Sequence, residues 1–137
     1  METSSAHDNA DLSAENPVEV WPASDLNLIS VDWPHLRTRA IIPAPSSGWD
    51  DLALTEWDLE AAAWEDFHQH SEVNLVIEGE LHIKVDEHEV VLGIGDTARV
   101  PAGKLGRYWA PRYARMIAVY GPNPHGLDTS DRKYWDL

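Results

Sequence analysis

The chain has 137 residues, of which 43% are hydrophobic, so it can bury one core and shows no sign of a second domain. Its formal net charge of −14, with no basic stripe and no apolar run long enough to cross a bilayer, argues against nucleic acid and membranes as partners. The sequence contains no cysteine, which excludes disulfides, thiolate ligands and a catalytic thiol, and we expect a cytoplasmic protein.

The first 16 residues differ from the rest of the chain in composition. They are rich in Ser, Ala, Asp, Asn and Glu and offer little to bury, so we predict a disordered leader over residues 1–16 and a folded domain over residues 17–137. Trp-Pro and Pro-Ala-Pro breaks then separate short extended segments. The strands predicted in this part cover residues 18–21, 26–31 and 37–42, and a loop is predicted at residues 43–51.

From residue 52 on, short apolar runs alternate with glycine-containing or charged turns. Residues 52–59 are predicted to form a strand, whereas residues 60–65 fit either a short helical turn or the connection into the next segment. Six further strands are predicted at residues 72–77, 80–85, 89–92, 97–100, 107–110 and 114–120. This rhythm favours an all-β antiparallel jelly-roll barrel, with extra N-terminal strands, over a fold of alternating strands and helices.

Ligand chemistry is concentrated in one short stretch of the sequence. His68 and His70 are one residue apart, so on a strand they project to the same side, roughly 6 to 7 Å apart at Cα, and both could hold one ion. Glu72 supplies the carboxylate of a two-histidine, one-carboxylate site. On an uninterrupted strand His68 and Glu72 would lie about 13 Å apart, so a bend or bulge near Ser71 is required if both bind one ion.

Glycine and proline recur at fixed distances after this stretch. The residues concerned are Gly79, which follows Glu72 after six residues, and then Gly95, Pro101 and Gly103. Together with the histidine pair they resemble the two motifs of the cupin superfamily of small jelly-roll barrels. The position of the histidine that ends the second motif is taken by Gly106. The resemblance covers roughly residues 50 to 122 and implies the fold more specifically than the function.

The resemblance implies a metal site and a pocket inside the barrel. The implied ligands are His68, His70 and Glu72, and the implied cofactor is a divalent ion, for which Fe, Mn, Ni and Zn are all suited to this ligand type. A small organic molecule would bind beside the ion, in space that Gly106 leaves open. The implied function is that of a metal-binding enzyme acting on a small organic substrate, of the dioxygenase, isomerase, lyase or cyclase type.

The parity of the last strand indicates which side chains face this pocket. If Gly106 occupies the histidine position of the motif, Tyr108 shares its inward face. Tyr108 is then the candidate catalytic group, because its phenol can hydrogen-bond a substrate or act as a general acid or base. Asn74 shares a face with Glu72 and can orient either a ligand carboxylate or Glu72 itself. The expected substrate-binding residues are therefore Asn74, Gly106 and Tyr108.

The sequence also leaves open an alternative of a different class. Losing the fourth ligand at Gly106 weakens metal affinity without abolishing it, so the motifs alone do not establish a metal. The alternative is a metal-free cupin that binds a small molecule or acts as a regulator without catalysis. His68 and His70 would then hydrogen-bond an acidic ligand.

The N-terminal segment bears on assembly. Residues 18–42 carry Trp21, Trp33 and several aliphatic side chains that one small barrel does not fully cover. Small cupins resemble one another in pairing barrels through their N-terminal strands. We therefore expect a homodimer.

Overall fold

The computed structural model describes residues 17–23 and 27–137, and its regular structure there consists of β-strands. These residues contain no helix, and hence no helix that is long and apolar enough to cross a membrane. The all-β, antiparallel prediction is confirmed. The predicted leader, residues 1–16, and Leu26 of one predicted strand lie outside the described residues.

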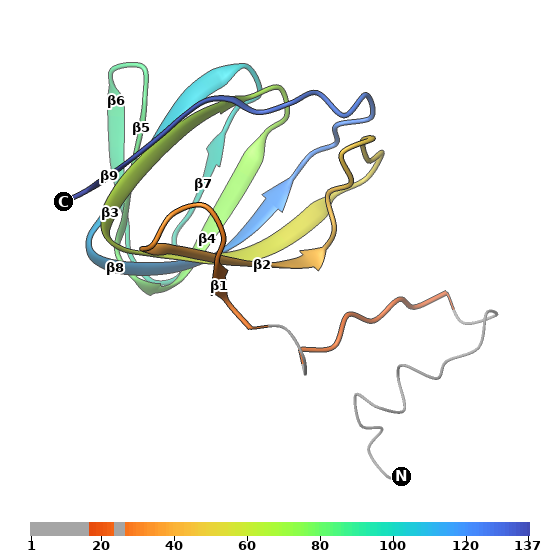
Figure 1. Cartoon of the computed structure of the whole chain (residues 1–137), viewed down its shortest axis with the longest axis horizontal. Coiled ribbons are helices and arrows are strands. Elements are labelled where there is room, and N and C mark those ends of the chain that lie inside the picture. Colours follow the sequence, from red (N-terminus) through yellow and green to blue (C-terminus); the bar gives the residue numbers. More distant parts are fainter. Residues whose placement is uncertain (1–16, 24–26) are drawn as a thin grey trace, which may run out of the picture.

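In the described residues, nine strands join into one antiparallel sheet that folds over on itself as a barrel (Figure 1). In chain order they are β1 (Ile29–Ser30), β2 (Leu36–Ile42), β3 (Ala53–His68), β4 (Glu72–Gly79), β5 (Leu81–Val85), β6 (His88–Leu92), β7 (Thr97–Val100), β8 (Lys104–Tyr120) and β9 (Ser130–Asp136). The extra N-terminal strands expected from the sequence are present as β1 and β2.

Strands β3 and β8 pair with each other along almost their whole length, from Ala53 opposite Tyr120 to His68 opposite Lys104. On its other edge β3 pairs first with β2 and then with β9. On its other edge β8 pairs first with β5 and then with β4. Two half-sheets therefore share β3 and β8. The first half-sheet also contains β1, β2, β4 and β7, and the second also contains β5, β6 and β9.

A bulge in β3 determines which residues face the interior. Ala61 has a positive φ of 46°, and the register with β8 shifts at this point. Before the bulge the core residues of β3 have odd numbers, as for Trp57 and Leu59. Because one inserted residue moves all following side chains to the opposite face, the inward positions after it have even numbers. Asp66 and His68 point to the interior for this reason.

Aromatic and aliphatic side chains fill the space between the two half-sheets. Trp57 is 2% exposed and packs edge-on against Trp64 and Tyr108, with ring centroids 5.6 and 5.9 Å away. Trp64 in turn stacks on Tyr108 at 5.0 Å. Burying each large apolar side chain contributes about 1.5–3 kcal/mol. The aliphatic part of the core comprises Leu59, Val76, Leu81, Ile83, Leu92, Val100 and Met116.

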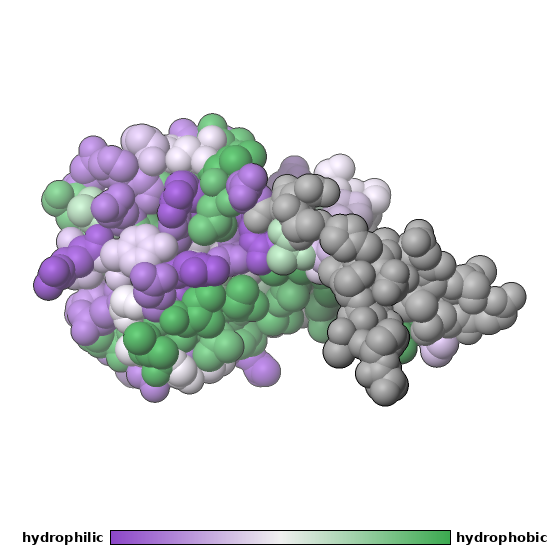
Figure 2. All heavy atoms as spheres, turned by 90° about the horizontal axis from the view of Figure 1, so that it is seen from below, coloured by the Kyte–Doolittle hydropathy of each residue, from purple (hydrophilic) through white to green (hydrophobic). Residues whose placement is uncertain are grey.

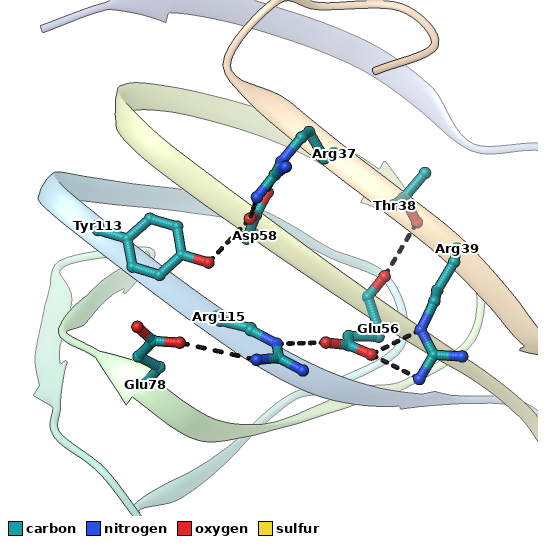
Figure 3. A network of polar contacts seen from close by, with 8 residues as sticks. All are labelled: Arg37, Thr38, Arg39, Glu56, Asp58, Glu78, Tyr113 and Arg115. Atoms are coloured by element: carbon teal, nitrogen blue, oxygen red, sulfur yellow. Dashed lines mark hydrogen bonds and ion pairs between the residues drawn. The ribbon is translucent and has the colours of Figure 1, made fainter. Parts of the chain in front are cut away.

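On the outer face of the first half-sheet, arginines cover two buried carboxylates (Figure 3). Asp58 is 2% exposed and accepts hydrogen bonds from Arg37 and from a tyrosine hydroxyl. Glu56 is also 2% exposed and pairs with both Arg39 and Arg115. A buried carboxylate is tolerated only when it is paired. The arginines therefore make two acidic residues compatible with the most central strand of the sheet.

The strand predictions are confirmed, to within two residues at each end, for β2, β4, β5, β6 and β7. Of the two alternatives for residues 60–65, the helical turn is wrong and the connection into the next segment is confirmed, because these residues continue β3 through the bulge. Residues 107–110 and 114–120 belong to one strand, β8. Residues 18–21 form no strand. Strand β9 was not predicted, because its Ser-Asp-Arg-Lys start lacks the apolar alternation of a strand.

Two turn glycines adopt positive φ in different surroundings. Gly79 has a φ of 78°, and a Cβ built on it would lie 2.1 Å from the carbonyl oxygen of Tyr113. Gly95 has a φ of 89°, but a Cβ there would meet no atom within 4 Å. Both positions favour glycine for its backbone freedom, and only Gly79 also lacks room for a side chain.

This pair gives a test of the turn between β4 and β5. We expect Gly95→Ala to lower the free energy of unfolding by about 1 kcal/mol, the cost of a left-handed alanine. Gly79→Ala should cost about 3 kcal/mol or more, because backbone must move as well. Urea denaturation of both variants measures the difference. Equal losses would show that the close approach of Tyr113 to Gly79 does not exist in solution.

Candidate functional site

A cavity of about 530 Å³ lies between the end of β3 and the loops around residues 44–49 and 123–129. Aromatic and charged side chains share its walls. The side chains that matter below are Trp49, Trp64, Asp66, His68, His70, Glu72, Tyr120, Asp128 and Arg132. We refer to Asp66, His68 and Glu72 as the polar floor. All three are at least 95% buried, so the floor lies deep in the barrel.

His68 and Glu72 form an ion pair within the polar floor. The Nδ1 atom of His68 donates a hydrogen bond to the carbonyl oxygen of His70 at 2.6 Å, and Nε2 lies 3.0 Å from Glu72 Oε1. Burial acts to lower the pKa of His68, but the hydrogen bond and charge of Glu72, helped by Asp66 and the His70 carbonyl, raise this pKa above its usual value. This environment favours the imidazolium form, in which both ring nitrogens donate.

Asp66 lies beside this pair and has an oxygen without a hydrogen-bond partner. Its Oδ1 is 3.9 Å from His68 Nε2, beyond hydrogen-bonding distance, although the residue is only 5% exposed. Burial, and then the negative charge of Glu72, raise the pKa of Asp66 to about 7. Asp66 therefore changes its protonation state near neutral pH, which is what a general acid or base requires.

His70 reaches the site from the bend between β3 and β4. Strand β3 ends at His68 and β4 begins at Glu72, so the bend predicted near Ser71 is confirmed. The His70 ring lies parallel to that of His68, with centroids 4.4 Å apart, and its Nδ1 is 3.2 Å from the Ser71 carbonyl oxygen. Burial lowers the pKa of His70. These opposite shifts in pKa favour a neutral His70 ring stacked on a charged His68 ring.

Asn74 is fully buried and holds Glu72 in place. Its Nδ2 donates to Glu72 Oε2 at 2.7 Å, and its Oδ1 accepts a hydrogen bond from Trp57 Nε1 at 2.8 Å. With His68 on Oε1, both oxygens of the Glu72 carboxylate are engaged. Asn74 thus takes the carboxylate-orienting role, one of the two expected from the sequence, and does not line the cavity.

Tyr108 and Gly106 lie together behind the cavity wall. Tyr108 is 0% exposed and its hydroxyl has no hydrogen-bond partner, so the expected inward orientation is confirmed. A Cβ at Gly106 would lie 2.7 Å from that hydroxyl. The space next to Gly106, where the second cupin motif has a histidine, is therefore occupied by the phenol of Tyr108. Neither residue lines the cavity.

The donors present fit a metal ion only in part. Two ligand atoms that each lie about 2.1 Å from one ion at right angles are about 3.0 Å apart. The 3.0 Å between His68 Nε2 and Glu72 Oε1 meets this condition. In the part of the chain that the structure describes, however, no three His, Asp or Glu side chains are arranged to hold an ion. A third ligand, from His70 or Asp66, would have to move into place.

Several residues of the site were not singled out from the sequence. Asp66 points into the interior because of the bulge in β3, and the sequence pattern does not reveal this bulge. Arg132 comes from β9, donates to Asp32 at 2.8 Å and lies over the Trp33 ring at 4.7 Å. Trp49 comes from the loop before β3, and its Nε1 donates to the Tyr120 carbonyl at 3.1 Å. The alternation of Trp64, Asp66 and His68 was the one signal that could have identified Asp66.

A comparison with protein families identifies the class. The cupin domain model matches residues 55–120, the segment that runs from β3 to the end of β8. With the antiparallel barrel and solved cupin structures of the same fold, this establishes that the chain belongs to the cupin superfamily. A search of curated proteins finds no match. The family expected from the two sequence motifs is confirmed.

Solved structures similar to this chain share its fold at low sequence identity. The EutQ protein of Clostridium difficile is 23% identical, with a TM-score of 0.57 over 66% of this chain and 64% of that one. An RmlC-like cupin from Shewanella frigidimarina is 24% identical, with a TM-score of 0.59 over 72% and 86%. A structure described as FeII HppE is 19% identical, with a TM-score of 0.63 over 80% and 63%. The match thus spans less than two thirds of EutQ and of HppE.

The raised pKa of Asp66 predicts how stability depends on pH. The folded state holds this proton more tightly than the unfolded state, so the contribution of Asp66 to stability is greatest below the unfolded pKa of 3.8 and is lost as pH rises through about 7. Asp66→Asn cannot ionise, so between about pH 4 and about pH 8 it should gain roughly 3 kcal/mol relative to the wild type.

Chemical denaturation across this pH range, with a chelator present, measures the effect. Glu87→Gln is the matched control, because Glu87 is exposed in the turn between β5 and β6. Its curve should stay parallel to that of the wild type. If Asp66→Asn also stays parallel, Asp66 is not buried as described.

Proposed function

We propose that this cupin binds a small organic molecule in its cavity and exchanges a proton with it through Asp66. The observation that carries the proposal is the unpartnered, buried Asp66 oxygen in the wall of the 530 Å³ cavity. A cavity of this size matches those that hold small ligands. Perturbed titratable groups in such a cavity are typical of functional sites.

The other two residues of the polar floor fix the chemistry around Asp66. Glu72 has a hydrogen bond on each carboxylate oxygen, from His68 and from Asn74, so the protein already stabilises its charge. His68 is held by the same bond, and its raised pKa favours a positive charge 3.9 Å from Asp66. Asp66 is the member of the polar floor with a buried oxygen that accepts no hydrogen bond. Proton transfer by such a group serves isomerase, lyase and cyclase reactions, all of which the family resemblance implied.

Two sequence-based expectations are carried into this proposal in changed form. Asn74 acts on the ligand through the Glu72 carboxylate that it orients. Tyr108 and Gly106 lie behind the cavity wall and affect the ligand indirectly. Tyr108 stacks on Trp64 at 5.0 Å, and Trp64 lines the cavity. We propose these three as positioning residues, with Tyr108 no longer needed as the proton-transferring group.

A second candidate function is a metal-dependent enzyme with Fe, Mn, Ni or Zn. The 3.0 Å distance between His68 Nε2 and Glu72 Oε1 favours it, because these atoms can be adjacent ligands of one ion. His70 or Asp66 would complete the set after a side-chain movement. The similar structure described as FeII HppE is an analogy at the level of the fold. When bound, the ion would polarise a substrate oxygen.

One purification separates the two candidates. Protein made without a metal-affinity tag should contain substoichiometric metal by elemental analysis and release a small molecule when denatured. Asp66→Asn should release at least about tenfold less, since it loses a charge-assisted hydrogen bond, whereas Glu87→Gln should match the wild type. Failure to find any bound or bindable molecule would contradict the proposal.

The same samples test the metal candidate. Near-stoichiometric metal that is lost in His68→Ala and His70→Ala but kept in His82→Ala would favour the metal-dependent enzyme over the metal-free function of Asp66. His82 is a suitable control, because it lies on β5 and hydrogen-bonds Glu80 at 3.1 Å outside the cavity. Metal lost in His82→Ala instead would contradict the assignment of the site to the polar floor.

We also propose that the protein is a homodimer that pairs through the outer face of the first half-sheet. Figure 2 shows an apolar band beside a hydrophilic one on the face seen from below. Pairing brings Val73 beside Val119, and Leu75 beside Ile117, on that outer face. Leu75 is 37% exposed, and the other three are partly exposed. The predicted interface at residues 18–42 adjoins this face through β2.

Charge supports the same face. It carries Arg37, Arg39, Arg99 and Arg115, four of the ten Lys and Arg residues of the chain. Glu56, Asp58 and Glu78 pair with three of these arginines, so positive and negative charges largely balance on this face although the chain has a net charge of −14. Two copies repel each other least when such faces meet.

Light scattering of the purified protein should therefore give twice the chain mass at micromolar concentration. Leu75→Arg should shift this to the mass of one chain, because it buries an unpaired charge at the centre of the interface. Val91→Arg replaces a side chain that is 51% exposed on β6, and it should leave the dimer intact. A wild-type monomer, or a dimer unaffected by Leu75→Arg, would be evidence against this interface.

A further inference from the structure

The charged side chains around the cavity are unevenly matched. Three carboxylates line it, those of Asp66, Glu72 and Asp128, against one guanidinium, that of Arg132. Arg132 is already bonded to Asp32 at 2.8 Å. His68 offsets Glu72 at 3.0 Å. The cavity therefore has an excess of negative charge, and its buried carboxylate with an unpartnered oxygen is that of Asp66.

One oxygen of Asp66 lacks a hydrogen-bond donor. Both oxygens of Glu72 accept hydrogen bonds, whereas Oδ1 of Asp66 accepts none, although only 5% of the residue is exposed. On the outer face of the first half-sheet, the equally buried Asp58 is bonded by Arg37. A buried carboxylate oxygen left in this state is destabilising unless a donor reaches it. Asp66 also lines the cavity, so a bound molecule can bring a donor to this carboxylate.

Three aromatic rings stand around the same space. Trp49, Trp64 and Tyr120 all line the cavity. Aromatic faces are negative at their centres and attract cations, and they also pack well against alkyl chains. A carboxylate that needs a donor, in a cavity walled by aromatic rings, is the combination that recognises an organic ammonium group.

We propose that the cavity of this cupin takes a small primary or secondary amine, whose ammonium group donates a hydrogen bond to Asp66 and whose carbon chain packs against Trp49, Trp64 and Tyr120. This inference rests on the proposed function, since it names the chemical class of the molecule bound there. An anionic ligand would meet Asp66, Glu72 and Asp128. A neutral alcohol could bond Asp66 but would leave the charge excess uncompensated.

Three four-carbon probes differ in charge and little else. Butylamine, 1-butanol and butyrate can be titrated into the full-length protein at neutral pH, with binding followed by calorimetry and by tryptophan fluorescence. We expect butylamine to bind at least about tenfold more tightly than 1-butanol, the ratio for one charge-assisted hydrogen bond, and butyrate not to bind. Asp66→Asn should lose that tenfold preference, and Glu87→Gln should keep it.

Other results would overturn the inference. Equal binding of butylamine and 1-butanol, stronger binding of butyrate, or an amine preference that survives Asp66→Asn would each show that Asp66 does not select an ammonium group. Binding of none of the three probes would overturn it as well. The proposed function fails separately, in the extraction of bound molecules: a ligand that is not an amine, released by the wild type and lost in Asp66→Asn, would uphold that function and reject only the amine.

Discussion

The single inserted residue at Ala61 is the constraint on which the site depends. Strand β3 runs through both half-sheets, and without the bulge its even-numbered residues would face outward along their whole length. Glu56 and Asp58, before the bulge, do face outward and are covered by arginines. Asp66 and His68, after it, face the cavity. The left-handed conformation of Ala61 costs about 1–2 kcal/mol. The bulge that requires it lets one strand present carboxylates to two different environments.

A chain of hydrogen bonds connects the core to the polar floor. Trp57 donates to Asn74, Asn74 donates to Glu72, and Glu72 accepts from His68. Every member is at least 98% buried. Such a network has a fixed geometry inside a protein, because breaking one bond leaves neighbouring polar groups without hydrogen-bond partners. Glu72 therefore acts as a fixed negative charge. It raises the pKa of His68 and, after the effect of burial, that of Asp66, so the packing of the core sets the proton affinity of the site.

The sequence predicted the barrel and most strands, because apolar alternation and turn glycines are local signals. The bend before Glu72 was required by the spacing of His68 and Glu72, if both bind one ion. The sequence could not predict the bulge at Ala61, since nothing in Glu-Ala-Ala-Ala-Trp marks where a residue is skipped in pairing, and Asp66 was overlooked with it. Strand β9 was not predicted for another reason. It is stabilised by pairing with β3, and the composition of β9 does not reveal this pairing. Gly106 was understood as open space, but the phenol of Tyr108, two residues away on the same face, fills it.

The distribution of cations shows which carboxylates the fold supports and which it leaves available. Within the part of the chain that the structure describes, seven of the ten Lys and Arg residues form ion pairs, with Glu56, Asp58, Glu65, Asp86 and Asp32 among others. Glu65 and Asp66 are both 5% exposed and adjacent in sequence, yet Glu65 has Arg107 and Lys133 whereas Asp66 has only the distant edge of His68. A buried carboxylate that no lysine or arginine bonds is destabilised in its charged form. Its partner must be a proton, an ion or a ligand, and Asp66 lies in the wall of a cavity with room for any of the three.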